Sequence, residues 1–107
     1  VTLTGSTPAG SAVAALAGKY LKKTVLELGG SDAYLILHDA DIEYAINTIA
    51  PGRLLNCGQS CVSPKRLVVH ESLKSRFEQG IADIFAKQVI GDPLDAKTTM
   101  GPMSRAD

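Results

Sequence analysis

The sequence predicts an α/β protein built from parallel strands joined by helices, and two observations support this fold class. Short β-rich runs alternate with longer segments in which apolar residues recur every three or four positions, the spacing of one helix face. The composition is that of a globular protein, with 45% hydrophobic residues, 21% charged residues and 10 glycines in a chain of 107. This length corresponds to one small domain or to a piece of a larger one.

The first 28 residues predict a strand–helix–strand unit. Val1 to Leu3 is a short apolar run that enters a turn, in which Thr7 is the candidate helix cap and Pro8 the first helical residue. An apolar stripe with helical spacing follows, and Thr24 to Leu28 is the next strand. Such a unit implies a parallel strand pair with a right-handed crossover, the repeating piece of nucleotide-binding α/β domains.

The next segment predicts a strand followed by a helix. Tyr34 to Leu37 forms the strand, and Asp39-Ala40-Asp41 supplies caps for a helix whose apolar positions begin at Ile42. Pro51 interrupts this pattern. Because a proline inside a helix removes a hydrogen bond and costs about 3 kcal/mol, we expect a kink or an end at Ala50.

The remainder predicts one more strand and one more helix after a glycine-flanked loop. Arg66 to His70 alternates weakly as a strand, and Leu73 to Gln88 carries a narrow apolar helix face. Gly91-Asp92-Pro93 predicts a turn, and the segment from Leu94 to Asp107 has no periodicity and is expected to be a loop.

Charge and cysteine content exclude several classes of function. Eleven basic and eleven acidic residues give a net charge of zero, so we expect neither a nucleic-acid nor a membrane partner. No signal peptide or long apolar span precedes Cys57 and Cys61, and we expect a reducing cytoplasm. A disulfide between these cysteines would be strained, and no metal site is expected because His38 and His70 are distant in sequence.

Cys61 is the candidate nucleophile. It lies in a loop with Gly58 before it and Lys65 and Arg66 after it, and such a loop keeps a thiol accessible while the cations favour the thiolate. A lone cysteine is more often a small buried hydrophobe. That alternative stays open for Cys61 and is preferred for Cys57.

Glu27 is the candidate general base. It ends an apolar strand, where burying a carboxylate is costly unless the group is paired or has a function. Burial generally raises the pKa of a carboxyl group toward neutrality, which suits a general base. The sequence supports equally well the alternative that Glu27 faces solvent on an alternating strand.

The chain carries two strings, Leu26-Glu27-Leu28-Gly29-Gly30 and Gly58-Gln59-Ser60-Cys61, which resemble the glutamate and cysteine signatures of the aldehyde dehydrogenase superfamily. Their spacing matches, and the similarity extends to Thr4-Gly5-Ser6-Thr7 upstream and to Gly91-Asp92-Pro93 and Gly101-Pro102 downstream. The resemblance therefore covers the whole chain.

A shorter string resembles one branch of that superfamily. Gly30-Ser31-Asp32 is similar to the corresponding string of the succinate-semialdehyde dehydrogenases. Many other members of the superfamily carry a lysine after the glycines. Two residues depart from the pattern. Ala33 stands where the branch usually has proline, and Pro51 lies inside a segment that the family keeps as a helix. Because of the Gly30-Ser31-Asp32 string, succinate semialdehyde is the substrate that the resemblance suggests.

The resemblance implies roles for the two reactive side chains. Cys61 would attack an aldehyde to form a thiohemiacetal, a hydride would pass to NAD or NADP, and Glu27 would deprotonate the water that hydrolyses the resulting thioester. The backbone N–H of Cys61 would be one of two donors to the oxyanion. An aldehyde oxidoreductase is the function that follows.

Four further residues are implied at the cofactor. Gly5 and Ser6 would lie at the nicotinamide and pyrophosphate, and Leu28 and Gly29 would meet the carboxamide through backbone atoms. For Gly5 and Ser6 an ordinary strand-to-helix turn remains the alternative, because no full glycine-rich fingerprint is present.

The resemblance also implies a domain organisation. Residues 1–28 would be the C-terminal part of a Rossmann-like nucleotide-binding domain, and residues 29–107 the N-terminal part of the α/β catalytic domain. The chain would then be a central fragment of an enzyme that is homo-oligomeric at full length. Because most of the cofactor site would lie elsewhere, we expect the fragment to be inactive alone.

Two alternatives of other classes remain. In the first, the chain is a truncated and non-catalytic remnant that self-associates through exposed apolar faces. In the second it is a thiol redox module that uses Cys57 and Cys61, for which a reversible disulfide would be required; we expect none to form.

Overall fold

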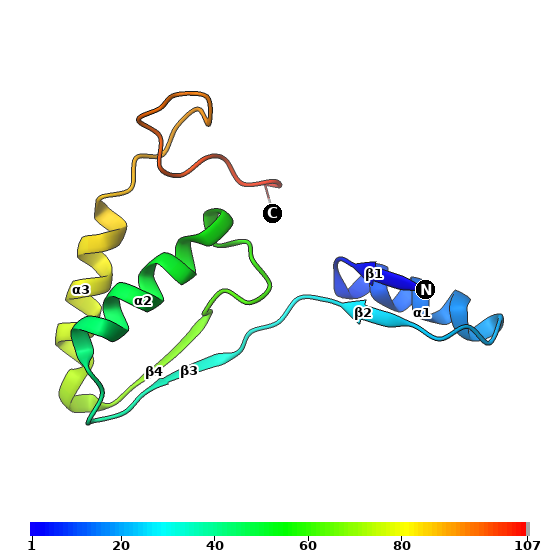
Figure 1. Cartoon of the computed structure of the whole chain (residues 1–107), viewed down its shortest axis with the longest axis horizontal. Coiled ribbons are helices and arrows are strands. Elements are labelled where there is room, and N and C mark those ends of the chain that lie inside the picture. The colour runs from blue at the N-terminus through cyan, green and yellow to red at the C-terminus, as the bar shows by residue number, and fades with distance from the viewer. Residues whose placement is uncertain (107) are drawn as a thin grey trace. The chain divides into compact units, whose positions relative to one another are not determined.

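The structure, a computed structural model, describes residues 1–106 and divides into two compact units, the first comprising Val1–Gly30 and the second beginning at Ser31. Both units contain a parallel pair of strands connected through a helix (Figure 1).

The first unit is the predicted strand–helix–strand. Strand β1 (Thr2–Thr4) and strand β2 (Val25–Glu27) pair in parallel, with Thr2 opposite Val25 and Thr4 opposite Glu27. Helix α1 (Thr7–Lys19) connects them. The parallel pairing predicted from the sequence is confirmed.

The cap of α1 differs from the prediction. Ser6, in extended conformation, is the N-cap, because its Oγ accepts a hydrogen bond from the backbone N–H of Ala9 at 3.4 Å. The expectation that Thr7 caps the helix is wrong, since Thr7 is already helical and Pro8 occupies the second helical position. At the other end Leu21 adopts a left-handed conformation with φ 52°, where the chain turns toward β2.

Helix α1 lies very close to the residue that follows β2. Gly10 is buried, and a Cβ at this position would come within 2.7 Å of Leu28 Cδ2. Beyond Gly10 and Ala17 the helix buries little. An apolar hollow of about 400 Å³ is left open on this unit, lined by Val1, Val13, Leu16, Ala17, Tyr20 and Lys22.

The second unit repeats the pattern with a further helix. Strand β3 (Ala33–Ile36) and strand β4 (Arg66–Val69) pair in parallel, with Ala33 opposite Arg66 and Ile36 opposite Val69. Between them lie helix α2 (Ile42–Leu54) and the 3₁₀ turn η1 (Leu55–Gly58). The short turn η2 (Glu71–Leu73) leads into helix α3 (Lys74–Ala86).

Helix α2 begins as predicted and ends later than predicted. Asp41 is its N-cap, accepting a hydrogen bond from the Tyr44 N–H at 3.0 Å. The helix continues through Pro51 to Leu54, so the expected end at Ala50 is wrong. Pro51 lies in the last turn, where its missing N–H removes one hydrogen bond near the helix end rather than in the middle.

The core of the second unit lies between α2, α3 and the strand pair. Helices α2 and α3 approach closely at Gly80, where a Cβ would come within 2.5 Å of Ile46 Cδ1. Strand β4 alternates, with Leu67 and Val69 packed against the core and Val68 exposed. The buried cluster consists of Ile36, Ile42, Ile46, Ile49 and Phe77.

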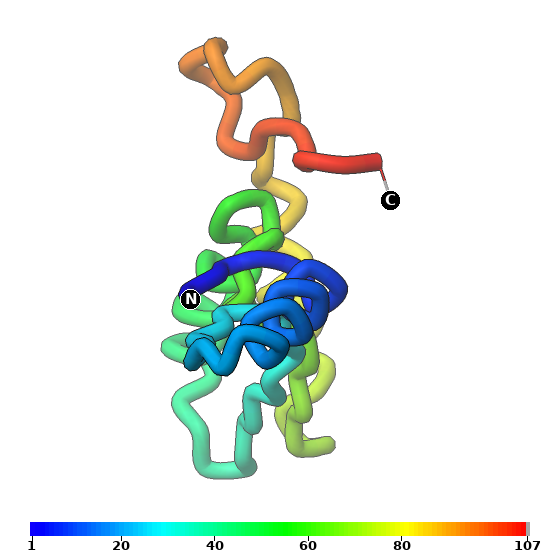
Figure 2. The backbone as a smooth tube through the Cα atoms, turned by 90° about the vertical axis from the view of Figure 1, so that its right-hand side faces the viewer, coloured from blue at the N-terminus to red at the C-terminus, as the bar shows by residue number. Residues whose placement is uncertain are grey.

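From Leu94 to Ala106 the chain is a loop, as predicted, apart from a single bridge between Ile90 and Met100, and Asp107 lies outside the described residues. Figure 2 shows the chain leaving the helix and turning back in the orange part of the tube. The N–H groups of Thr99 and Met100 donate to the Val89 carbonyl at 2.9 and 3.1 Å, and Gly91 N–H donates to Met100 O at 3.2 Å. Throughout the described part of the chain, every helix is too short or too polar to cross a bilayer.

Candidate functional site

Five of the six predicted site residues gather at one edge of the β1–β2 pair. The strands are parallel, so both of their carboxyl ends lie at the same edge, and Gly5 N–H donates to the Glu27 carbonyl there at 3.0 Å. Ser6, Leu28 and Gly29 follow directly along the chain. Ligands of open α/β sheets bind outside the carboxyl ends of the strands, and this edge is therefore a candidate binding surface.

The same edge has features that fit a dinucleotide. Ser6 begins a helix of 13 residues whose first turn contains no acidic side chain, and a helix N-terminus favours phosphate. Gly5 and Gly29 are exposed. A Cβ at Gly29 would meet nothing within 4 Å, and one at Gly5 would meet only ordinary contacts from 3.8 Å. The packing of this unit does not require these glycines, which leave bare backbone where a planar ring can lie.

Glu27 is exposed on the first unit. The two alternatives, a general base and a carboxylate that only faces solvent, both stay predictions. The backbone of Glu27 is fixed by the ladder to β1 and by the Gly5 hydrogen bond. The carboxylate is thus held at the sheet edge by its strand and stays open to water.

Cys61 lies on an exposed turn of the second unit. The N–H of Ser63 donates to the carbonyl of Ser60 at 3.2 Å, which places Cys61 at the second position of a tight turn. The Cys61 thiol is free and its residue is exposed. Within the part of the chain that the structure describes, nothing accepts a hydrogen bond from the Cys61 N–H. Both the thiol and this N–H are therefore open to a reacting molecule.

The backbone before Cys61 is left-handed over three successive residues. Asn56 has φ 51° and ψ 45°, Cys57 has φ 57° and ψ 30°, and Gly58 has φ 76°. Such backbone is unfavourable for residues with a Cβ and persists where the surroundings fix it. In the sequence the glycine is a recognisable candidate for such a conformation, whereas Asn56 and Cys57 carry no comparable signal.

Two residues missed by the sequence analysis hold this loop against the end of α2. Arg53 Nη1 donates to the Gly58 carbonyl at 2.7 Å and to Ser63 Oγ at 3.3 Å. Ser63 is only 3% exposed, and its Oγ lies 3.0 Å from the carbonyls of both Gly52 and Arg53. In the sequence, an arginine in a last helical turn indicates only a favourable interaction with the helix dipole.

The C-terminal loop contacts the other side of the cysteine segment. Gln59 Oε1 accepts hydrogen bonds from the Ser104 backbone N–H at 2.9 Å and the Ser104 hydroxyl at 2.8 Å. The Cys57 thiol lies 3.4 Å from the Gly101 carbonyl, and Cys57 is half-buried. Cys57 is therefore half-buried against this loop, whereas the sequence favoured a fully buried residue.

The cations next to Cys61 contact backbone carbonyls. Lys65 Nζ donates to the carbonyl of Cys61 at 3.3 Å, and Arg66 Nε donates to the carbonyl of Ser31 at 2.8 Å. The rings of His38 and His70 lie 5.7 Å apart by their centroids. Across the described residues, no group of three or more potential metal ligands forms a cluster.

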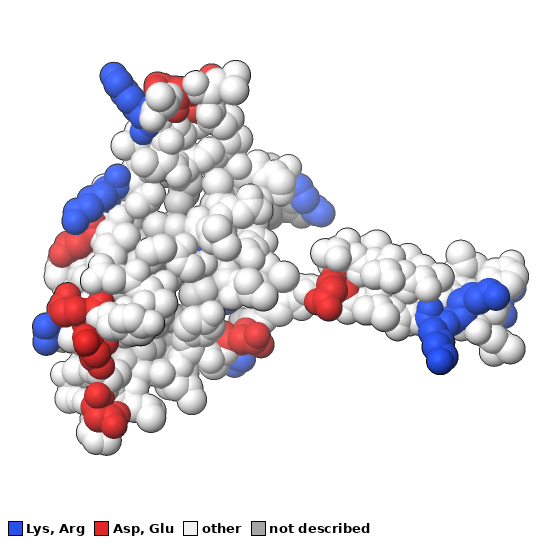
Figure 3. All heavy atoms as spheres, in the orientation of Figure 1, with Lys and Arg blue, Asp and Glu red and all other residues white. Residues whose placement is uncertain are grey.

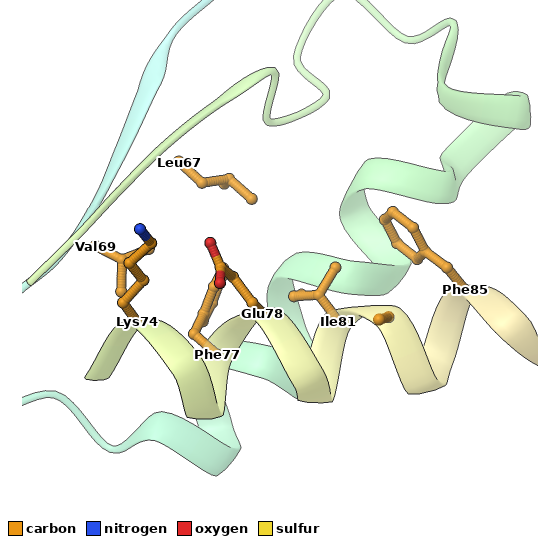
Figure 4. A pocket seen from close by; sticks show the side chains of 8 residues that line it. Leu67, Val69, Lys74, Phe77, Glu78, Ile81 and Phe85 are labelled. Atoms are coloured by element: carbon orange, nitrogen blue, oxygen red, sulfur yellow. The ribbon is translucent and has the colours of Figure 1, made fainter. Parts of the chain in front are cut away.

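A second hollow, of about 440 Å³, lies between β4 and α3 and is separate from the predicted site residues. Figure 4 shows Phe77 and Ile81 pointing into it, with Lys74 and Glu78 among its polar lining residues. None of the predicted site residues lines it. On the face seen in Figure 3, both acidic and basic side chains lie along the margin formed by α3.

Comparison with known proteins identifies the fold. Residues 1–107 match the model of the aldehyde dehydrogenase family. The chain is 49% identical over 97% of its length to an aldehyde dehydrogenase of Paenarthrobacter nicotinovorans, and 46% identical over 100% to the NAD(P)+ succinate semialdehyde dehydrogenase Sad of Escherichia coli K12. Succinic semialdehyde dehydrogenase from Streptococcus pyogenes, in complex with NADP+, superposes with a TM-score of 0.91 at 45% identity over 98% of the chain. The chain spans 23% of the length of each.

Proposed function

The chain belongs to the aldehyde dehydrogenase family, and from that premise we propose that it is a central segment of an NAD(P)-dependent enzyme that oxidises an aldehyde to a carboxylic acid. The observation that carries the proposal is the exposed turn at Cys61, where, within the described residues, the thiol forms no disulfide and the backbone N–H donates no hydrogen bond. These are the two groups that thioester chemistry requires of a nucleophile.

In the first half of the reaction Cys61 acts on the aldehyde. Its thiolate attacks the carbonyl carbon, a C–S bond forms, and the negative charge that develops on the oxygen is stabilised by the Cys61 N–H. When bound, the nicotinamide supplies an acceptor for the hydride that leaves the same carbon. The product on the chain is a thioester of Cys61.

In the second half Glu27 acts on water. Its exposed carboxylate takes a proton from a water molecule, and the hydroxide adds to the thioester carbonyl. The C–S bond then breaks, the carboxylic acid departs, Cys61 returns to its thiolate form, and Glu27 releases its proton to water. Gly5, Ser6, Leu28 and Gly29 would hold the cofactor during both halves, consistent with their common place at the sheet edge.

Succinate semialdehyde is the substrate that we propose. The support is the identity of 46% to the E. coli relative and 45% to the S. pyogenes protein, both named for this aldehyde, together with the Gly30-Ser31-Asp32 string. The names of these relatives include NAD(P)+ and NADP+, so either cofactor is proposed.

The test uses a protein of full family length that contains this segment. Turnover is followed as NADH or NADPH absorbance with succinate semialdehyde and a panel of other aldehydes. Cys61→Ala should reduce turnover by at least about a thousand-fold, because the covalent route is lost. Cys57→Ser is the matched control and should retain turnover within about tenfold. Undiminished turnover in Cys61→Ala would contradict the proposal.

A second candidate function concerns the chain on its own. Several large apolar side chains are exposed, among them Leu21 at 93% and Leu94 at 92%. Such surfaces favour association. They support the alternative that the 107 residues are the whole gene product, a non-catalytic remnant that self-associates.

A further inference from the structure

The turn that carries Cys61 is held from both sides by one side chain of α2. Gly58 lies three residues before the cysteine and Ser63 lies two residues after it. Arg53 Nη1 donates to the Gly58 carbonyl at 2.7 Å and to the Ser63 hydroxyl at 3.3 Å. The two ends of the segment that contains the thiol are thus joined through one guanidinium nitrogen.

The anchor of this contact is rigid. Arg53 stands in the last turn of α2, a helix whose Ile46, Ile49 and Ala50 are buried in the core of the unit. Ser63 is also buried, and its hydroxyl lies 3.0 Å from the Gly52 and Arg53 carbonyls at the helix end. A group attached to a packed helix holds a reactive loop more accurately than other loop residues can.

The backbone is shaped to accept the guanidinium. A Cβ at Gly58 would lie 2.8 Å from Arg53 Nη1 and 3.1 Å from the Arg53 carbonyl, so a side chain there would displace the contact. The left-handed conformations of Asn56, Cys57 and Gly58 turn the Gly58 carbonyl toward α2. This unfavourable backbone and the Arg53 contact therefore support each other.

We propose that Arg53 is a positioning residue for the nucleophile: by holding the Gly58 carbonyl and the Ser63 hydroxyl, it fixes the turn that presents the Cys61 thiol and N–H. The inference rests on the proposed role of Cys61. Arginine suits this role better than lysine, because its planar fork of donors is fixed in direction whereas an ammonium group is not. Arg53 touches no reacting atom and acts through the loop.

The experiment measures the pre-steady-state burst of NAD(P)H in the full-length protein. Arg53→Ala should slow the burst about 10- to 100-fold while KM for the aldehyde changes less than about threefold, since displacement of a reacting group by about 1 Å has an effect of this size. Added guanidinium ion should restore part of the burst rate. Arg53→Lys should be intermediate, and Ser63→Ala should slow the burst about 3- to 10-fold.

Arg76→Ala is the matched control. Arg76 pairs with Glu43 at the opposite end of α2, with Nη2 to Oε1 at 2.7 Å, and both side chains are largely exposed. This variant should show the wild-type burst with or without guanidinium. If Arg53→Ala does not fold, Arg53→Lys and Ser63→Ala decide the matter, and wild-type bursts in both would overturn the proposal.

The Cys61→Ala variant distinguishes the catalytic role of Cys61 from the positioning role of Arg53. A normal burst in Cys61→Ala would overturn the proposed function itself. If Cys61→Ala abolishes the burst and Arg53→Ala retains the wild-type rate, only the positioning role fails. Loss of activity in Arg53→Ala that follows the unfolded fraction, without rescue by guanidinium, would assign Arg53 to general stability and also overturn the inference.

Discussion

At the scale of single residues, the two cysteines illustrate how local backbone separates a reactive thiol from a packed one. Cys61 is exposed on a turn, whereas Cys57 is half-buried with its thiol 3.4 Å from the Gly101 carbonyl. Only four positions separate them in sequence. The difference arises from the left-handed run at Asn56–Gly58 and from the contacts of Arg53, Ser63 and the C-terminal loop.

We predict that Cys61 reacts with iodoacetamide faster than Cys57, by about tenfold or more, because reactivity follows the accessibility of the thiolate. Peptide mapping by mass spectrometry after timed alkylation of the folded protein measures both rates. The same reaction in denaturant is the control, and there the two rates should converge. Equal rates in the folded protein would show that the loop does not hold the two thiols in different surroundings.

The sequence can identify Cys61 and Glu27 as candidates, because a reactive residue type and its neighbouring glycines can be read directly from the order of the residues. It cannot show Arg53 and Ser63 as partners of the loop, since their contact depends on how α2 ends. The alternative for Glu27 was also beyond the sequence: strand alternation allows either face, and the structure shows this carboxylate exposed.

At the scale of elements, the fold rests on two parallel strand pairs and on one close helix crossing. The crossing of α2 and α3 occurs at Gly80, where a Cβ would lie 2.5 Å from Ile46 Cδ1 and 3.1 Å from its Cγ2. Ile46 belongs to the buried core and is only 4% exposed. The missing side chain at Gly80 therefore sets how closely the two helices pack.

We predict that Gly80→Ala lowers the free energy of unfolding by about 1–2 kcal/mol. Overpacking of a filled core costs about 1–3 kcal/mol, and the better helix propensity of alanine offsets about 0.5–1 kcal/mol of that. Urea denaturation of the full-length protein measures the change.

Gly18→Ala is the matched control in α1. A Cβ at Gly18 would meet nothing within 4 Å, so this variant should keep or slightly raise the stability. Similar losses in both variants would contradict the assignment of the effect to the α2–α3 crossing.

Helical and strand periodicity predicts these elements well, because each buries one face against the core. All four strands and all three α-helices described in the structure lie where the sequence predicts them, with ends shifted by a few residues. The predicted ends of α1 and α2 differ from the observed ends for local reasons. Ser6 competes successfully with Thr7 for the cap through its bond to Ala9, and Pro51 is tolerated because it lies in a last turn.

At the scale of the whole molecule, the chain spans 23% of the length of its relatives and leaves two apolar hollows open. One lies on α1 and the other between β4 and α3. The β3–β4 pair also exposes Leu35 and Val68. These surfaces are what a fragment of a larger fold is expected to show, and the proposed domain boundary near Leu28 and Gly29 stays a prediction.

We predict that the 107-residue chain alone has no aldehyde-dependent reduction of NAD or NADP, because most of the proposed cofactor site lies outside it. We also expect it to self-associate, since its apolar faces are open to solvent. Absorbance assays and size-exclusion chromatography over a range of concentrations measure these two properties. Turnover that Cys61→Ala abolishes would show that the isolated chain is a complete catalyst.

The central claim, that Cys61 forms a thioester which Glu27 helps to hydrolyse, has one direct test. Full-length protein carrying Glu27→Gln is mixed with succinate semialdehyde and NAD or NADP, quenched in acid and mapped by mass spectrometry. We expect one equivalent of NAD(P)H and then arrest, with a succinyl group on the peptide that contains Cys61. Continued turnover at the wild-type rate, or an acyl group on another residue, would contradict it.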